Sequence, residues 1–217
     1  MVNLNIDLYA DGADLETMET LAKDYRVAGL TTNPSLMKKA GITDYREFAN
    51  KVLSIVGSKP VSFEVLADDL SEMERQAREI SSWGANCFVK IPITNTKGES
   101  TATLIEKLSG KVKVNVTAVL TKNQINEAAQ ALYGSPGIIS VFAGRIADPG
   151  QDPTLTMRYA VSRTRSGETK VLWASTREVL NVMQAEYCGA DIITCGPDII
   201  NKLHGLNADL AHVSLAT

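Results

Sequence analysis

Histidine and cysteine are scarce in this chain of 217 residues. Its two histidines, His204 and His212, both lie near the C-terminal end. A histidine-based catalytic triad or a multi-histidine metal site is therefore nearly excluded. The three cysteines, Cys87, Cys188 and Cys195, are odd in number, far apart and set in apolar surroundings. We expect them to be reduced core residues, and we expect neither a disulfide nor a metal cluster.

Long apolar runs and blocks of basic residues are also missing. No apolar stretch approaches the roughly 18 residues that a membrane-spanning helix requires. The N-terminus has neither the basic region nor the apolar stretch of a signal peptide. The formal net charge is −3, and a mildly acidic chain without a basic block is a poor nucleic-acid binder. We therefore expect a cytoplasmic protein that binds neither nucleic acid nor membrane.

Short apolar runs alternate with helical stretches from one end of the chain to the other. Nearly continuous apolar strands separated by helices are typical of a parallel sheet covered by helices. Strands are expected at residues 4–8, 27–30, 61–67, 86–93, 112–120, 138–142, 170–173 and 190–194. This pattern predicts a single domain, residues 1–217, with the α/β architecture of a compact (β/α)₈ barrel. The alternative is a doubly wound open sheet, but no G-x-G-x-x-G motif follows the first strand.

The expected strand at residues 86–93 carries a lysine, Lys90, among apolar residues. An amine in such surroundings is costly to keep charged, so its neutral, nucleophilic form becomes accessible. One interpretation is an edge strand whose lysine points to solvent. The other is an amine that attacks a carbonyl carbon and forms a Schiff base.

Polar residues recur at the ends of the expected strands, which is where the active site of such a barrel lies. Each has a structural explanation when it is taken alone. Asp7 could pair with a cation, Glu64 could lie on an edge, and Asn33 could cap a helix that begins at Pro34. Together they predict one convergent site. Its candidate residues are Asp7, Thr31, Asn33, Glu64, Lys90, Asn115, Thr117, Ser140, Phe142, Arg145, Ser175 and Arg177.

Five segments of the chain resemble, in the right order, segments of the transaldolase family. They are residues 29–35, 88–94, 115–117, 141–146 and 174–177. The similarity covers essentially the whole chain and is greatest with the small transaldolases and fructose-6-phosphate aldolases. It implies a class I aldolase type of barrel enzyme that acts on sugar phosphates in the pentose phosphate pathway, without a metal or other cofactor. It also implies a homo-oligomer, a pentamer or a decamer of paired pentamers.

The resemblance assigns roles to the matching residues. Lys90 would form the Schiff base, and Asp7 would take the proton from the C4 hydroxyl as the bond between C3 and C4 breaks. Glu64 and Thr117 would hold a water and move protons during imine formation. Asn33 and Asn115 would bond to the sugar hydroxyls or the carbinolamine, and Thr31 would line the same opening. Ser140 would contact the dihydroxyacetone unit, and Phe142 is a further substrate-binding residue. Arg145, Ser175 and Arg177 would hold the phosphate.

The fate of the three-carbon enamine separates two activities of this family. Capture by an acceptor aldehyde makes the enzyme a transaldolase, and hydrolysis to free dihydroxyacetone makes it an aldolase. Aldolase-type members tend to carry glutamine where this chain has Glu64, and tyrosine where it has Phe142, so transfer is favoured. Thr176 replaces the usual aromatic residue beside the expected phosphate site, so a differently substituted anionic ketose is an alternative substrate. A phosphosugar isomerase, or a phosphate-binding protein in which Lys90 is only an anion ligand, is the competing class.

Overall fold

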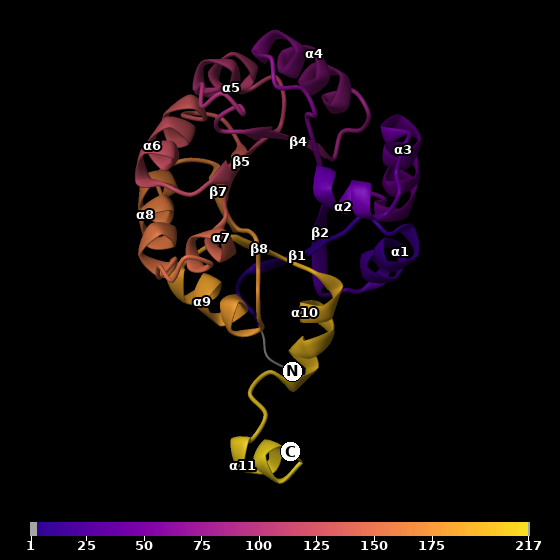
Figure 1. Ribbon diagram of the computed structural model, residues 1–217, viewed down its shortest axis with the longest axis vertical. Coiled ribbons are helices and arrows are strands. Elements are labelled where there is room, and N and C mark those ends of the chain that lie inside the picture. Colours follow the sequence, from indigo (N-terminus) through magenta and orange to yellow (C-terminus); the bar gives the residue numbers. More distant parts are fainter. Residues whose placement is uncertain (1–3, 217) are drawn as a thin grey trace.

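Eight parallel strands close into a barrel in chain order, with β8 paired to β1 (Figure 1). The computed structural model describes residues 4–216, so the expected domain extends beyond the described residues at both ends. The predicted (β/α)₈ barrel is confirmed, and the doubly wound sheet is excluded. The strands are β1 (Asp7–Asp11), β2 (Val27–Thr31), β3 (Val61–Glu64), β4 (Cys87–Pro92), β5 (Val114–Val119), β6 (Gly137–Val141), β7 (Thr169–Trp173) and β8 (Ile192–Cys195).

Most of the helices form a ring around the barrel, α2 and α7 lie inside this ring in the view, and α11 stands apart from it (Figure 1). On α11, Leu210 and Leu215 are 82% and 88% exposed. None of the helices in residues 4–216 has the length and apolar character needed to cross a membrane. The helices are α1 (Leu15–Lys23), α2 (Pro34–Lys39), α3 (Tyr45–Val56), α4 (Leu70–Ser81), α5 (Ala102–Leu108), α6 (Lys122–Ala131), α7 (Ala143–Ala147), α8 (Thr154–Thr164), α9 (Leu180–Cys188), α10 (Pro197–Lys202) and α11 (Leu210–Leu215), with a 3₁₀ turn at Leu203–Gly205.

Alternation along the strands divides the side chains between two cores. Residues such as Val89, Ile91 and Val116 belong to the large cluster that includes the buried helix residues. A smaller cluster contains Tyr9, Ile138, Leu172, Ala174 and Ile192. Successive residues of a strand point to opposite faces, so these two sets occupy the outside and the inside of the barrel. The apolar inner cluster fills part of the interior, and the polar residues described below occupy the rest.

Strand β1 lies three residues later than the sequence pattern predicts. We expect a strand at residues 4–8, but β1 runs from Asp7 to Asp11. Its buried centre is Leu8, Tyr9 and Ala10, which is the longest apolar run in this part of the chain. A three-residue shift moves the carboxyl end of the strand from Leu8 to Asp11, and with it the residue that β1 presents to the site.

Candidate active site

Lys90 lies inside the barrel. Strand β4 is paired with β3 on one side and β5 on the other, so it is not an edge strand. Lys90 is 5% exposed, and its Nζ donates a hydrogen bond to the Thr32 carbonyl oxygen at 2.8 Å. Nζ also lies 3.0 Å from Glu64 Oε2, with both side chains largely buried. The interpretation of a solvent-facing lysine is therefore wrong, and the amine is held by a partner that can exchange protons with it.

Glu64 and Thr117 flank the lysine on the neighbouring strands. Glu64 is the last residue of β3 and pairs in register with Lys90, and Thr117 on β5 pairs with Pro92. The Thr117 hydroxyl is buried and has no hydrogen-bond partner among the described residues. A buried hydroxyl without a partner is costly in a folded protein, so it marks a position where a water or a substrate atom is expected to bind.

The structure does not bring Asp7 to Lys90, and this corrects the role predicted for Asp7. Asp7 is the first residue of β1, at the opposite end of the strand from the site. Its carboxylate is 46% exposed and lies 3.2 Å from Lys170 Nζ. Alternation places residues 7, 9 and 11 on one face of the strand but does not fix their depth. Asp7 therefore shares the inward face without reaching the carboxyl end.

Asp11 occupies the position that we assigned to Asp7. It is the last residue of β1, and its Oδ1 accepts a 2.8 Å hydrogen bond from Thr31 Oγ1. Asn33 Nδ2 lies 3.5 Å from its other oxygen. Burial raises the pKa of Asp11, while the nearby Lys90 ammonium and the two hydrogen bonds oppose this effect. A half-buried carboxyl near the lysine, with a raised pKa, is suited to exchanging protons with a substrate.

Asp11→Asn is expected to increase the free energy of unfolding at neutral pH, because desolvation disfavours the charged carboxylate of Asp11. Since the pKa of Asp11 is raised, the folded protein binds this proton more tightly than the unfolded chain does. The contribution of Asp11 to stability is thus largest below its unfolded pKa and is lost as pH rises through the folded pKa. Urea unfolding of both proteins between about pH 4 and about pH 8 measures the difference. A variant that is no more stable than the native protein at the upper pH would contradict this prediction.

Thr31 and Asn33 each form one hydrogen bond to Asp11 and a second one to another part of the barrel. The Asn33 side chain caps α2 by accepting a hydrogen bond from the Leu36 N–H, and its amide nitrogen is left to face Asp11. Thr31 Oγ1 also lies 2.6 Å from Thr194 Oγ1 on β8. Thr194, which we did not predict, therefore completes the polar ring around Asp11. Its inward position on β8 was the signal that could have identified it.

A second buried network lies across β3, β5 and β6. Ser140 Oγ donates to Asn115 Oδ1 at 2.7 Å, and Asn115 Nδ2 donates to Ser62 Oγ at 3.1 Å. All three residues are at most 2% exposed. Asn115 and Ser140 are thus brought together as predicted, and Ser62 is a further member that sequence reasoning missed. Because the amide is held from both sides, its orientation in the barrel is fixed.

The residues predicted to bind phosphate lie on the loops after β6 and β7. Arg145 is exposed on the short helix α7, and Phe142 is half-buried against the inner apolar cluster. Ser175 has a backbone φ of 64°, which is uncommon for a residue other than glycine. Arg177 donates two hydrogen bonds to Asp148, from Nε at 3.1 Å and from Nη2 at 2.8 Å. Arg177 therefore already has an anionic partner in the free protein.

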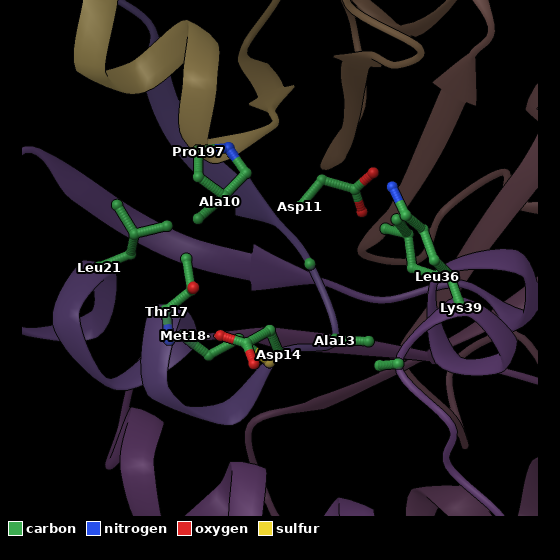
Figure 2. Close-up of a pocket in the computed structure, with 12 residues that line it drawn as sticks. Ala10, Asp11, Ala13, Asp14, Thr17, Met18, Leu21, Leu36, Lys39 and Pro197 are labelled. Carbon is green, nitrogen blue, oxygen red and sulfur yellow. Dashed lines mark hydrogen bonds between the residues drawn. The ribbon is translucent and has the colours of Figure 1, made fainter.

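A pocket of about 420 Å³ adjoins Asp11 (Figure 2). It lies among the end of β1, the helices α1 and α2, and Pro197 at the start of α10. Most of its lining is apolar, and Lys39 from α2 supplies the positive charge. Lys90 does not line it, whereas Asp11 does, so this pocket shares Asp11 with the site around the lysine. Among residues 4–216, no three histidine, cysteine, aspartate or glutamate side chains gather as a metal site would require.

The site around Lys90 thus combines a buried amine with two carboxyl groups in different environments, and two arginines lie in the segments that follow β6 and β7. The amine can act as a nucleophile, because a lysine that loses its proton presents a free electron pair. Glu64 and Asp11 can each carry a proton. Such a set fits a reaction in which a carbonyl compound is held covalently while protons move on both sides of it.

Known proteins resemble this chain in sequence, and others resemble it in fold. Residues 8–214 match the family described as Transaldolase/Fructose-6-phosphate aldolase. The chain is 35% identical over 190 residues to a probable transaldolase of Dehalococcoides mccartyi, covering 86% of this chain and 85% of the relative. It is 36% identical over 197 residues to one of Methanococcus maripaludis, covering 90% and 88%. In structure it resembles orotidine 5'-monophosphate decarboxylase from Metallosphaera sedula, with a TM-score of 0.59, 15% identity, and coverage of 97% of this chain and 100% of the other. At that identity the last similarity concerns the fold alone.

Proposed function

The chain belongs to the transaldolase and fructose-6-phosphate aldolase family, and on that premise we propose that it transfers a dihydroxyacetone unit between sugar phosphates. The donor is fructose 6-phosphate or sedoheptulose 7-phosphate, and the acceptor is an aldose phosphate, as in the pentose phosphate pathway. The observation that carries the proposal is the buried Lys90 amine, 3.0 Å from Glu64 Oε2 inside the barrel.

The reaction begins at Lys90. The neutral amine attacks the C2 carbonyl carbon of the ketose, and the resulting carbinolamine loses water to give a protonated imine. Glu64 is near enough to supply the proton that converts the C2 hydroxyl into water. The unpartnered Thr117 hydroxyl supports a role in holding this water. The imine withdraws electrons from the bond between C3 and C4 and so weakens it.

Bond cleavage requires a base at the C4 hydroxyl, and we assign this role to Asp11. As the carboxylate takes the hydroxyl proton, C4 becomes an aldehyde, and the electrons of the C3–C4 bond move toward the imine nitrogen to form an enamine. The enamine then attacks the acceptor aldehyde, and Asp11 returns its proton to the new hydroxyl. Hydrolysis of the imine releases the product and restores Lys90. The raised pKa of Asp11 suits both proton transfers.

Polar residues around Lys90 and Asp11 would hold the sugar. Thr31 and Asn33 bond to Asp11 and so lie beside the hydroxyl that loses its proton. Asn115 and Ser140 form the buried network that would receive the dihydroxyacetone unit. These fixed groups would orient the substrate, since their hydrogen-bond directions are set before it binds.

The phosphate would bind at the loops after β6 and β7. Arg145 and Arg177 supply positive charge and forked donors suited to phosphate oxygens, and the Ser175 hydroxyl adds a directional contact. Both loops follow strands of the same barrel, so the phosphate group would lie at the rim while the carbonyl carbon reaches Lys90. This local positive charge would let a net-acidic protein bind an anionic substrate.

Transfer rather than hydrolysis is the outcome that we propose for the enamine. Glu64 is a carboxylate held by Lys90, and Phe142 adds an apolar face beside the site. By resemblance, aldolase-type members tend to have glutamine and tyrosine at these two positions. A fructose-6-phosphate aldolase that releases free dihydroxyacetone is the second candidate.

Incubation with fructose 6-phosphate as the donor and erythrose 4-phosphate as the acceptor tests this function. We expect sedoheptulose 7-phosphate to form faster than free dihydroxyacetone, with mass spectrometry following both products. Free dihydroxyacetone as the main product at saturating acceptor would favour the aldolase. Glucose 6-phosphate formed without any carbon–carbon cleavage would favour an isomerase and exclude both.

We also propose a cytoplasmic homo-oligomer, a pentamer or a decamer. The three cysteines are free and buried, as suits a reducing compartment. Leu210 and Leu215 on α11 are apolar and largely exposed in the single chain, which supports contact with another copy. Light scattering of the purified protein gives the mass in solution, and a monomer at micromolar concentration would exclude this assembly.

A further inference from the structure

Asp148 forms an ion pair with Arg177 that joins the two loops of the predicted phosphate site. Asp148 follows the last residue of α7, after β6, and Arg177 lies in the loop after β7. The guanidinium donates from Nε and Nη2, one bond to each carboxylate oxygen. Both side chains are 46% exposed, so the pair lies at the rim, where a ligand can reach it.

The segments that carry Asp148 and Arg177 also pack closely against each other through their backbones. Gly144, at the start of α7, lies so close to the Ser175 backbone that a Cβ atom on it would be 1.7 Å from the Ser175 carbonyl oxygen. The Gly144 N–H also faces the Ala174 carbonyl oxygen at 3.5 Å. This packing fixes Ser175 at its positive φ. The positions of Asp148 and Arg177 relative to each other are therefore set by the backbone and not only by their own side chains.

Three charges meet at this rim, and one of them is negative. The Arg177 guanidinium, and secondly Arg145, hold the pKa of Asp148 below its ordinary value, so Asp148 is ionised at neutral pH. Two arginines and one carboxylate leave the group with one net positive charge. The carboxylate also occupies Nε and one N–H of Nη2, so a ligand meets only the remaining donors of Arg177.

We propose that Asp148 is a specificity-determining residue that weakens the binding of a doubly charged phosphate at this rim. The inference rests on the proposed function, because it takes Arg145 and Arg177 to be the phosphate ligands. A phosphate monoester carries close to two negative charges at neutral pH, and a fixed carboxylate beside it repels it. An uncharged hydroxymethyl group at the same position meets no such repulsion. Asp148 thus lowers the ratio of kcat/KM for phosphorylated ketoses to kcat/KM for unphosphorylated ketoses.

The Asp148→Asn variant tests the proposal, because asparagine keeps the size of the side chain and one acceptor for Arg177. With fructose 6-phosphate and unphosphorylated fructose as donors, we expect the ratio of their kcat/KM values to rise about tenfold. The change should appear mainly in KM for the phosphorylated sugar, and it should shrink at high salt. Glu168→Gln is the matched control. It removes one exposed negative charge just before β7, at the opposite end of the barrel, and should leave the ratio unchanged.

A purely positioning role for Asp148 predicts the opposite sign. If its main effect is to orient Arg177, then Asp148→Asn weakens phosphate binding and the ratio falls, which would overturn the proposal, as would an unchanged ratio. Asp148→Glu keeps the charge and should retain the native ratio.

Titration calorimetry with inorganic phosphate compares phosphate binding by the native protein and by Asp148→Asn without requiring turnover of a sugar. Tighter phosphate binding by Asp148→Asn would support the inference even if no sugar were turned over, in which case only the proposed function would fail. Equal or weaker phosphate binding would overturn the inference, whatever the activity.

Discussion

The Lys90→Met variant is expected to turn over fructose 6-phosphate roughly 10⁴-fold more slowly than the native protein, or more slowly still. Methionine preserves most of the length of the side chain but has no amine, so no covalent bond to the substrate carbon can form. Neither Glu64 nor Asp11 can replace it, because a carboxylate does not form an imine. Steady-state release of the aldehyde product measures the effect.

Loss of the amine also removes the partner of a largely buried carboxylate. Glu64 is paired with Lys90, and an unpaired charge at this depth destabilises a folded protein. The double variant Lys90→Met/Glu64→Gln removes both charges and serves as the folding control. Circular dichroism and thermal unfolding should show a native-like barrel in the double variant, with turnover still absent. Activity within about tenfold of the native protein in either variant would contradict a covalent role for Lys90.

Asp11→Asn is expected to lower kcat by about 10²-fold to 10⁴-fold, whereas Asp7→Asn should change it by less than about threefold. Asp11 is half-buried and accepts hydrogen bonds from Thr31 and Asn33, and Lys90 is close enough to interact electrostatically with its carboxyl. Asp7 is half-exposed and paired with Lys170. An asparagine at residue 11 keeps an acceptor oxygen for Thr31 Oγ1, loses the acceptor for Asn33 Nδ2, and cannot accept the hydroxyl proton.

The two variants form a matched pair, since each replaces one carboxylate of β1 with the same amide. Asp11→Asn should also remove the acidic limb of the pH profile of kcat/KM, because that limb reports protonation of the base. In the native protein this limb should lie above the ordinary range for aspartate, since burial raises the pKa of Asp11. A large loss in Asp7→Asn together with a small one in Asp11→Asn would reverse the assignment made from the structure.

Much of the barrel could be predicted because its strands are buried on both faces. All eight expected strands overlap the observed ones, the first of them only at residues 7 and 8, and the register then places Glu64 beside Lys90. The apolar run around Lys90 was itself the signal. A lysine among apolar residues of a central strand can face only the barrel interior or the helix layer, and a polar neighbour in register favours the interior.

Depth along a strand could not be predicted in the same way. Asp7 and Asp11 have the same parity and the same side chain, so alternation does not distinguish them. The difference depends on where the strand begins, which pairing with β2 and β8 decides. Thr194 and Ser62 were missed for a related reason, because serine and threonine in strands have no distinctive pattern. Asp148 was missed because its contact with Arg177 joins two loops 29 residues apart in the chain.

The most direct test of the account is borohydride reduction of the protein in the presence of fructose 6-phosphate, followed by peptide mass mapping. A Schiff base predicts one irreversible adduct, on the peptide that contains residue 90. Its mass increase should correspond to the reduced dihydroxyacetone imine or to the reduced imine of the whole sugar, and Lys90→Met should show none. No adduct in the native protein while it turns over the sugar, or an adduct on a different lysine, would contradict the central claim that Lys90 bonds to the substrate.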